Sequence, residues 1–159
     1  MTVRPGTTAD IPAAEEVWRL SVTERDGALP PLEVAEAVGG ILRADTTHLF
    51  VAEEGSEIVG MGCTTPGREG GAARGPVIPD LCHVQMVFVR PSHWGGGTGG
   101  ELLDALLGHA RSIGQTRVQL WVVEDNERAT RLYARRGFTH TGTVIEENGV
   151  AIGLWSRPL

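Results

Sequence analysis

The sequence predicts an α/β fold in which a mixed central sheet is flanked by helices, and three observations support this. Segments with apolar residues at helical spacing alternate with β-like segments along the chain. The dipeptide Asn148-Gly149, between two β-like segments, predicts an antiparallel hairpin. The mostly apolar run Leu81–Arg90 suits a central strand that is covered on both faces.

The first part of the chain predicts a strand, two helices and two strands. A short strand stops at Pro5-Gly6, and the cap-type residues Thr8 and Asp10 precede a helix that fades at Asp26-Gly27. After the second helix the apolar period changes from helical to alternating. The expected elements are a strand at 2–4, helices at 11–26 and 32–43, and strands at 48–52 and 57–63.

The second part begins with the segment Pro66–Pro79, which is rich in Gly, Ala, Arg and Pro, has no periodicity and is expected to be a loop. Gly137 stands where a helix C-cap is expected. The expected elements are strands at 81–90 and 118–123, helices at 101–113 and 126–136, and a hairpin of strands 138–146 and 150–157. The order is β-α-α-β-β-β-α-β-α-β-β.

Length and composition limit the function classes. A chain of 159 residues suits one domain covering 1–159. The net charge of −6 argues against a nucleic-acid partner and is compatible with a cationic substrate. Without a signal peptide or an apolar run that could cross a membrane, we expect a cytoplasmic protein with no membrane partner. Cys63 and Cys82 lack metal-ligand spacing, which indicates buried free thiols rather than a disulfide or zinc site.

The glycine cluster Gly95–Gly100 follows a strand and opens a helix. Such a turn exposes backbone N–H groups at a helix N-terminus, which favours phosphate binding; the simpler alternative is a flexible surface turn. A P-loop is excluded, because no Lys-Ser or Lys-Thr follows. The dinucleotide pattern is formally satisfied by Gly95, Gly97, Gly100 and a later acid, Glu124. This interpretation ranks second among the nucleotide-binding ones, because Arg90 to Trp94 separate the strand from the first glycine and too little chain follows for a dinucleotide domain.

The stretch from Val87 to Leu103, with Pro91, the glycine cluster and Leu102-Leu103, resembles the acetyl-CoA motif of GNAT acetyltransferases. Gly97 and Gly99 fall on the two small positions of that motif. Trp94 stands where the family usually has Arg or Gln. We expect this difference to lower the affinity for the coenzyme without abolishing the site.

A second motif follows at the distance typical of the family. It comprises Asn126, Ala129, Leu132-Tyr133 and Gly137-Phe138 with the family's spacing. The pair of motifs makes the resemblance specific and covers Leu81 to Phe138.

The resemblance implies an acetyl-CoA-dependent N-acetyltransferase that uses direct attack by an amine, needs no metal, and has a sheet that splays between strands 81–90 and 118–123. It implies that backbone groups at the end of strand 81–90 bind the pantetheine arm, and that an N–H of Val87 or Phe88 polarises the thioester carbonyl. Asn126 caps its helix, contacts coenzyme, or does both. The expected coenzyme-binding residues are Val87, Phe88, Val89, Trp94, Gly95, Gly96, Gly97, Thr98, Gly99, Gly100 and Asn126.

Two residues are candidates for the chemistry. The resemblance places Tyr133 beside the coenzyme sulfur, where its phenol would protonate the leaving thiolate; the alternative is that it only packs on the sheet. Alternation places His83 on the same strand face as Val87, so it is a candidate general base, and a buried structural histidine is the equal alternative. Glu24, His48 and His93 are weaker candidates.

The acceptor is expected to be a primary amine, and a small molecule is the favoured class, but nothing identifies it. The first two helices and Pro66–Pro79 would shape its site. Trp18, Trp121 and Trp155 either line that site or pack in the core. A non-catalytic acyl-CoA-binding sensor of the same fold is the alternative function. The sequence leaves open whether the protein forms a homodimer.

Overall fold

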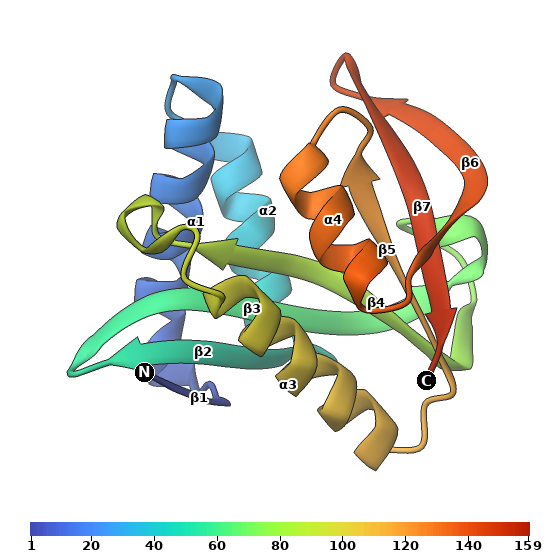
Figure 1. The fold of residues 1–159 in the computed structure, drawn as a ribbon, viewed down its shortest axis with the longest axis horizontal. Coiled ribbons are helices and arrows are strands. Elements are labelled where there is room, and N and C mark those ends of the chain that lie inside the picture. Colours follow the sequence, from blue (N-terminus) through green and yellow to red (C-terminus); the bar gives the residue numbers. More distant parts are fainter. The chain divides into compact units, whose positions relative to one another are not determined.

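The computed structural model describes residues 1–159 and contains one seven-stranded sheet and four α-helices (Figure 1). The strand order is β1-β2-β3-β4-β5-β7-β6. β4 and β5 pair in parallel, whereas β1–β2, β2–β3, β5–β7 and β6–β7 are antiparallel, so the predicted α/β class with a mixed sheet is confirmed. The elements are β1 (Thr2–Pro5), α1 (Ile11–Asp26), α2 (Leu32–Arg43), β2 (His48–Glu54), β3 (Glu57–Arg68), β4 (Val77–Val89), α3 (Thr98–Ser112), β5 (Arg117–Val123), α4 (Glu127–Arg135), β6 (Thr139–Glu147) and β7 (Val150–Pro158). No helix is long and apolar enough to span a membrane.

The chain divides into two compact units. The first unit comprises Met1–Thr65 and Met86–Gly108, and the second comprises Pro66–Gln85 and His109–Leu159. The boundaries fall inside β3, β4 and α3, so these three elements each contribute residues to both units. A single domain over 1–159 stays a prediction.

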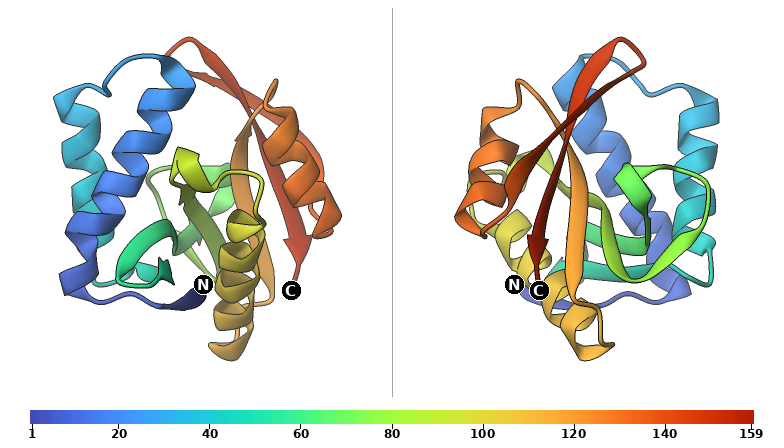
Figure 2. Two further views of the ribbon diagram at one scale, coloured as in Figure 1. Left: turned by 60° about the vertical axis from the view of Figure 1, so that its left-hand side comes forward. Right: turned by 90° about the vertical axis from the view of Figure 1, so that its right-hand side faces the viewer.

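In the first unit, two hydrophobic clusters lie on opposite faces of the strands. Val51 and Met61 share a core with residues of α1 and α2, whereas Ala52 and Val59 form a cluster with Leu102 of α3. The alternation along β2 therefore places α1 and α2 on one face and α3 on the other (Figure 2). A Cβ on Gly60 would lie 2.9 Å from Leu102 Cδ1, so glycine at this position lets α3 approach the strand closely.

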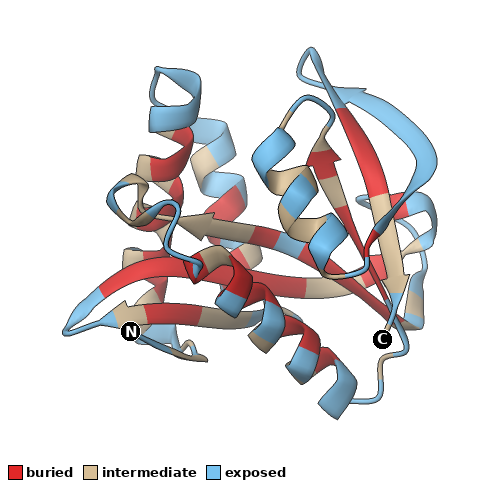
Figure 3. Ribbon diagram, viewed as in Figure 1, coloured by how far each residue is buried: buried red, intermediate tan, exposed pale blue.

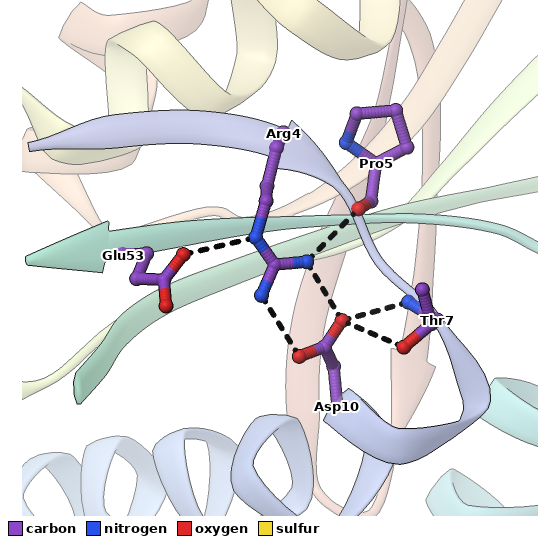
Figure 4. Close-up of polar contacts among 5 residues, drawn as sticks. All are labelled: Arg4, Pro5, Thr7, Asp10 and Glu53. Atoms are coloured by element: carbon purple, nitrogen blue, oxygen red, sulfur yellow. Dashed lines mark hydrogen bonds and ion pairs between the residues drawn. The ribbon is translucent and has the colours of Figure 1, made fainter. Parts of the chain in front are cut away.

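Arg4 joins β1 to the start of α1 and to β2. Its Nε donates to Glu53 Oε2 (3.0 Å), while Nη1 and Nη2 donate to the two carboxylate oxygens of Asp10 at 2.8 and 3.0 Å. Asp10 also accepts hydrogen bonds from the backbone N–H and hydroxyl of Thr7 (Figure 4). These bonds, led by the one from Arg4, hold the pKa of the Asp10 carboxyl well below its usual range. The network fixes the entry into α1.

In the second unit, β5, β7 and β6 form an antiparallel group whose outer strand β6 is exposed along its whole length (Figure 3). The predicted hairpin turn is present, because Glu147 pairs with Val150 and the two residues between them have positive φ, 51° at Asn148 and 78° at Gly149. Asn148-Gly149 suits this turn because Asn and Gly tolerate the left-handed conformation.

The prediction of a loop over Pro66–Pro79 is wrong at both ends. β3 continues to Arg68 and β4 already begins at Val77, and a short 3₁₀ turn at Glu69–Gly71 lies between them. The glycines and prolines of this segment interrupt the alternation of apolar and polar residues by which strands are predicted from sequence. Gly67 is a strand glycine in close contact, since an added Cβ would lie 2.4 Å from Leu81 Cγ.

The helix expected from Glu101 begins earlier, at Thr98. Its first turn contains Gly99 and Gly100, whose low helix propensity concealed the start.

Candidate active site

The glycine loop lies in the first unit and has the geometry of an open anion site. Gly95 and Gly97 have φ of 84° and 85°, and a Cβ on either would meet nothing within 4 Å. Glu101 N–H donates to Gly97 O (3.1 Å) and begins the backbone ladder of α3. The N–H groups of Thr98, Gly99 and Gly100 therefore precede the ladder, where the helix dipole favours an anion.

Trp94 anchors the start of the loop to the end of β4. Its indole Nε1 donates to Val89 O at 2.8 Å, although the residue is 38% exposed. The hydroxyl of Ser21 on α1 donates to the same carbonyl at 3.1 Å. Val89 O thus accepts two side-chain hydrogen bonds, and a contact of Val89 with coenzyme stays a prediction.

The end of β4 alternates in the direction of its backbone groups. The N–H of Arg90 donates to Val59 O of β3 at 2.8 Å. In a regular strand, Phe88 then faces β3 as well, while Val87 and Val89 direct their backbone groups to the other side. The backbone groups of Val87 therefore point away from β3, and a role of Val87 or Phe88 in polarising a thioester stays a prediction.

His83 lies in the second unit, is 9% exposed, and forms a hydrogen bond with Gln119. Gln119 Nε2 donates to Arg68 O (3.0 Å), which identifies this atom as the amide nitrogen, and it lies 3.3 Å from His83 Nδ1. Nδ1 is therefore the acceptor, and the proton of the neutral ring is on Nε2. Burial, helped by the charge of Arg68, lowers the pKa of His83 to about 4. This bonding fits the structural alternative better than a base, whose role stays a prediction.

Tyr133 and Asn126 both belong to the α4 region of the second unit. The Tyr133 ring packs edge-on against Phe138, with centroids 5.7 Å apart, and burial raises the pKa of the phenol to about 12. The phenol is therefore neutral at pH 7, as a proton donor must be. Asn126 Oδ1 accepts a hydrogen bond from Ala129 N at 3.0 Å, so it caps α4. A contact of Asn126 with coenzyme stays a prediction.

The weaker base candidates are spread over the first unit. Glu24 and His48 are exposed. His93 Nε2 lies 3.1 Å from a carboxylate oxygen of Glu54, and its Nδ1 lies 2.9 Å from Ser92 Oγ. Both ring nitrogens of His93 thus have partners.

The three tryptophans proposed for the acceptor site have different surroundings. Trp18 is buried in the core with α1 and α2, and Trp121 Nε1 donates to Gly71 O at 3.0 Å. Trp155 packs edge-on against His140, with centroids 5.6 Å apart, and its buried Nε1 has no hydrogen-bond partner. A pocket of about 420 Å³ in the second unit is lined by neither Tyr133 nor His83.

Several residues around the site were missed from the sequence. Gln119, which fixes the tautomer of His83, is the one polar residue inside the apolar strand sequence Val118–Val123, and that exception was an available signal. Ser21 and the partners of Arg90 gave no such signal, because their contacts join positions far apart in the chain.

Comparisons with known proteins agree on one family. Residues 13–138 match the family described as Acetyltransferase (GNAT) family. A mycothiol acetyltransferase of Amycolatopsis mediterranei is 36% identical over 64% of this chain and 33% of its own length. Another, of a Nocardioides species, is 32% identical over 83% of this chain and 48% of its own length. The chain thus spans about a third to a half of these curated relatives.

Solved structures share the fold over the whole chain. A ribosomal-protein-alanine N-acetyltransferase from Brucella melitensis has a TM-score of 0.77 at 23% identity, with 100% of both chains covered. The PaiA N-acetyltransferase from Thermoplasma acidophilum, solved in complex with coenzyme A, has a TM-score of 0.73 at 15% identity and the same coverage. At these identities the likeness shows the fold.

Proposed function

The chain belongs to the acetyltransferase (GNAT) family, and on that premise we propose that it transfers an acetyl group from acetyl-CoA to the primary amine of a small molecule. The observation that carries the proposal is the glycine loop, where Gly95 and Gly97 have positive φ and an added Cβ would meet no atom within 4 Å. The pyrophosphate of the coenzyme would accept hydrogen bonds from the N–H groups at the start of α3.

The curated relatives favour a small acceptor over a protein. They are named for mycothiol rather than for a protein, and they are 32–36% identical to this chain. The neighbour named for a ribosomal protein is 23% identical. We further propose that the two units act as one domain over 1–159 in the cytoplasm, where buried free thiols such as Cys63 and Cys82 persist.

The reaction forms one C–N bond and breaks one C–S bond. The neutral amine would attack the thioester carbonyl, the N–H of Val87 would stabilise the oxyanion, and the thiolate would leave while water accepts the proton that the nitrogen loses.

Tyr133 would donate to the departing sulfur. Proton transfer from a phenol with a pKa of about 12 to a thiolate with a pKa of about 8.5 is unfavourable. We therefore assign to Tyr133 a strong hydrogen bond to the sulfur, which forms fully as the C–S bond breaks. We expect Tyr133→Phe to lower kcat by roughly 10- to 1,000-fold with little change in the Kd of acetyl-CoA. An unaltered single-turnover rate would assign Tyr133 to packing.

A non-catalytic acyl-CoA sensor is the second candidate, and one observation favours it. His83, the candidate base on β4, is buried and carries its proton on Nε2, which leaves the amine without an identified proton acceptor on that strand.

The test of the proposed function has two stages. Acetyl-CoA at 100 times its Kd should raise the free energy of unfolding by about 2.7 kcal/mol, which thermal shift detects. Absence of stabilisation at millimolar coenzyme contradicts both candidates. A panel of amines, scored by thiol release and by mass spectrometry of the product, then separates them, because a sensor binds coenzyme without turnover.

A further inference from the structure

Two carboxylates flank the turn between β2 and β3. Glu54 pairs with Glu57 across the turn, and Gly55 between them has φ of 63°. Each carboxylate contacts a side chain on the segment that connects β4 to the glycine loop: Glu57 Oε1 lies 3.3 Å from Arg90 Nη1, and Glu54 Oε2 lies 3.1 Å from His93 Nε2. All of these residues belong to the first unit.

Arg90 is held at three points on β3. Its backbone N–H donates to Val59 O (2.8 Å), its Nε donates to Ile58 O (2.9 Å), and its Nη1 reaches Glu57. The side chain is only 24% exposed, so these charge-assisted bonds are partly shielded from water. A guanidinium can make both side-chain contacts at once because its donors form a rigid fork, which a lysine ammonium lacks.

His93 ends the short 3₁₀ turn Pro91–His93 that follows Arg90. Its N–H donates to Arg90 O (2.8 Å), and the N–H of Trp94 donates to Pro91 O (3.2 Å). The ring is held between Glu54 and Ser92. The chain is therefore held by hydrogen bonds or ion pairs at Arg90, His93 and Trp94, directly before Gly95.

Glycine lets the loop backbone approach a phosphate closely, and it also gives that backbone more conformational freedom than other residues would. Gly95 and Gly97 contact nothing through a side chain, so the order of the loop has to come from its two ends. One end is α3. A binding site made of backbone N–H groups works only when those groups are held near their final geometry.

We propose that the tip of the β2–β3 hairpin, Glu54–Glu57, is a positioning element for the coenzyme: through Arg90 and His93 it holds the leading end of the glycine loop in the phosphate-binding conformation. This inference rests on the proposed function. Arg90 and His93 are positioning residues, because their side chains bind the hairpin carboxylates rather than the coenzyme.

The experiment measures coenzyme A binding by isothermal titration to the full chain and its variants. Arg90→Lys keeps the charge but loses the fork, and we expect its Kd to rise about tenfold. Glu54→Gln and Glu57→Gln should raise the Kd roughly two- to fivefold, because each weakens one partly exposed contact between the hairpin and the loop. The matched control is Asp26→Asn, which breaks the exposed Arg25–Asp26 pair on α1 and should leave the Kd unchanged.

A kinetic readout separates positioning from general damage. The variants should raise the KM for acetyl-CoA and keep kcat at saturating coenzyme within about twofold of the unaltered protein. If the unaltered protein does not bind coenzyme A, the proposed function fails and this inference with it. If it binds, and Arg90→Lys and both glutamine variants bind equally well, the inference alone is overturned. The exposed glutamine variants serve this purpose even if Arg90→Lys proves unstable.

Discussion

Two glycine-rich segments of this chain use glycine for opposite reasons. In the segment 66–75, a Cβ on Gly67 would lie 2.4 Å from Leu81 Cγ, and one on Gly71 would lie 2.6 Å from the Trp121 ring. In the segment 94–100, a Cβ on Gly95 or Gly97 would enter empty space. Gly67 and Gly71 are needed because protein fills the space around them, whereas the space beside Gly95 and Gly97 is open.

The difference shows how to separate a packing glycine from a binding glycine. Both Gly71 and Gly97 have positive φ, 71° and 85°, so conformation alone does not distinguish them. The surroundings do, because an open left-handed glycine at the start of a helix leaves its backbone available to a ligand. Substitutions should therefore affect stability in one segment and coenzyme affinity in the other.

The largest effect is expected at Gly71. Gly71→Ala would push a methyl group into Trp121 and Leu154 and add left-handed strain, so we expect a loss of about 2–5 kcal/mol in the free energy of unfolding. Gly70→Ala is the matched control, since Gly70 has φ of 64° but no neighbour within 4 Å, and it should lose only about 1–2 kcal/mol. Urea denaturation measures both. Equal losses would show that packing is not the cause.

Next in size is the pH dependence of the packed segment, through His83. Because the folded pKa of about 4 lies below the ordinary value of 6.5, folding favours the neutral ring. The stabilisation is complete above pH 6.5 and is lost as pH falls towards 4, by up to about 3 kcal/mol. His83→Gln should have a lower Tm at pH 7.5 and a smaller decline between pH 7 and 5. An identical decline in both proteins would assign the acid sensitivity to other groups.

The open segment should respond through binding. Gly97→Ala would cost about 1–2 kcal/mol of stability through left-handed strain and would weaken coenzyme A at least about tenfold, because the methyl group intrudes where phosphate approaches. Gly114→Ala has the same strain, with φ of 86° and no neighbour within 4 Å, and lies outside the loop. It should lose similar stability and no affinity. Unchanged affinity in Gly97→Ala would remove the loop from the binding site.

The smallest effect is expected at Trp94. Trp94→Arg supplies the cation that is usual in the family but loses the indole bond to Val89 O, so we expect coenzyme affinity to stay equal or improve up to about fivefold. Trp94→Phe loses the same bond without adding charge and should bind slightly more weakly. Isothermal titration at two salt concentrations compares them, since only the arginine variant should gain salt dependence. A tenfold weaker arginine variant would contradict this assignment.

Local signals in the sequence predicted well. Asn148-Gly149 forms the expected turn, Asn126 caps its helix, and Gly137 with φ of 84° follows α4. In each case a few neighbouring residues decide the conformation. The assignment of the glycine cluster to coenzyme binding stays a prediction.

The misses involve contacts between distant positions. The strand ends in Pro66–Pro79 depend on pairing partners that local periodicity does not contain. The hydrogen bond of His83 is made with Gln119, 36 residues away, and that of the Arg90 side chain with Ile58, 32 residues away. Sequence alternation placed His83 on a face of its strand but gave no information on which nitrogen carries the proton.

The two cysteines allow the local opening of each unit to be measured separately. Both thiols are buried, and Cys63 belongs to the first unit while Cys82 belongs to the second. Burial raises the pKa of Cys63 to about 12, so its thiol is unreactive until the protein around it opens. The rate at which a thiol reagent labels each cysteine therefore measures the local opening of one unit, without any engineered probe. Equal opening free energies would mean that the chain unfolds as one cooperative domain, and unequal ones would identify the unit that opens first.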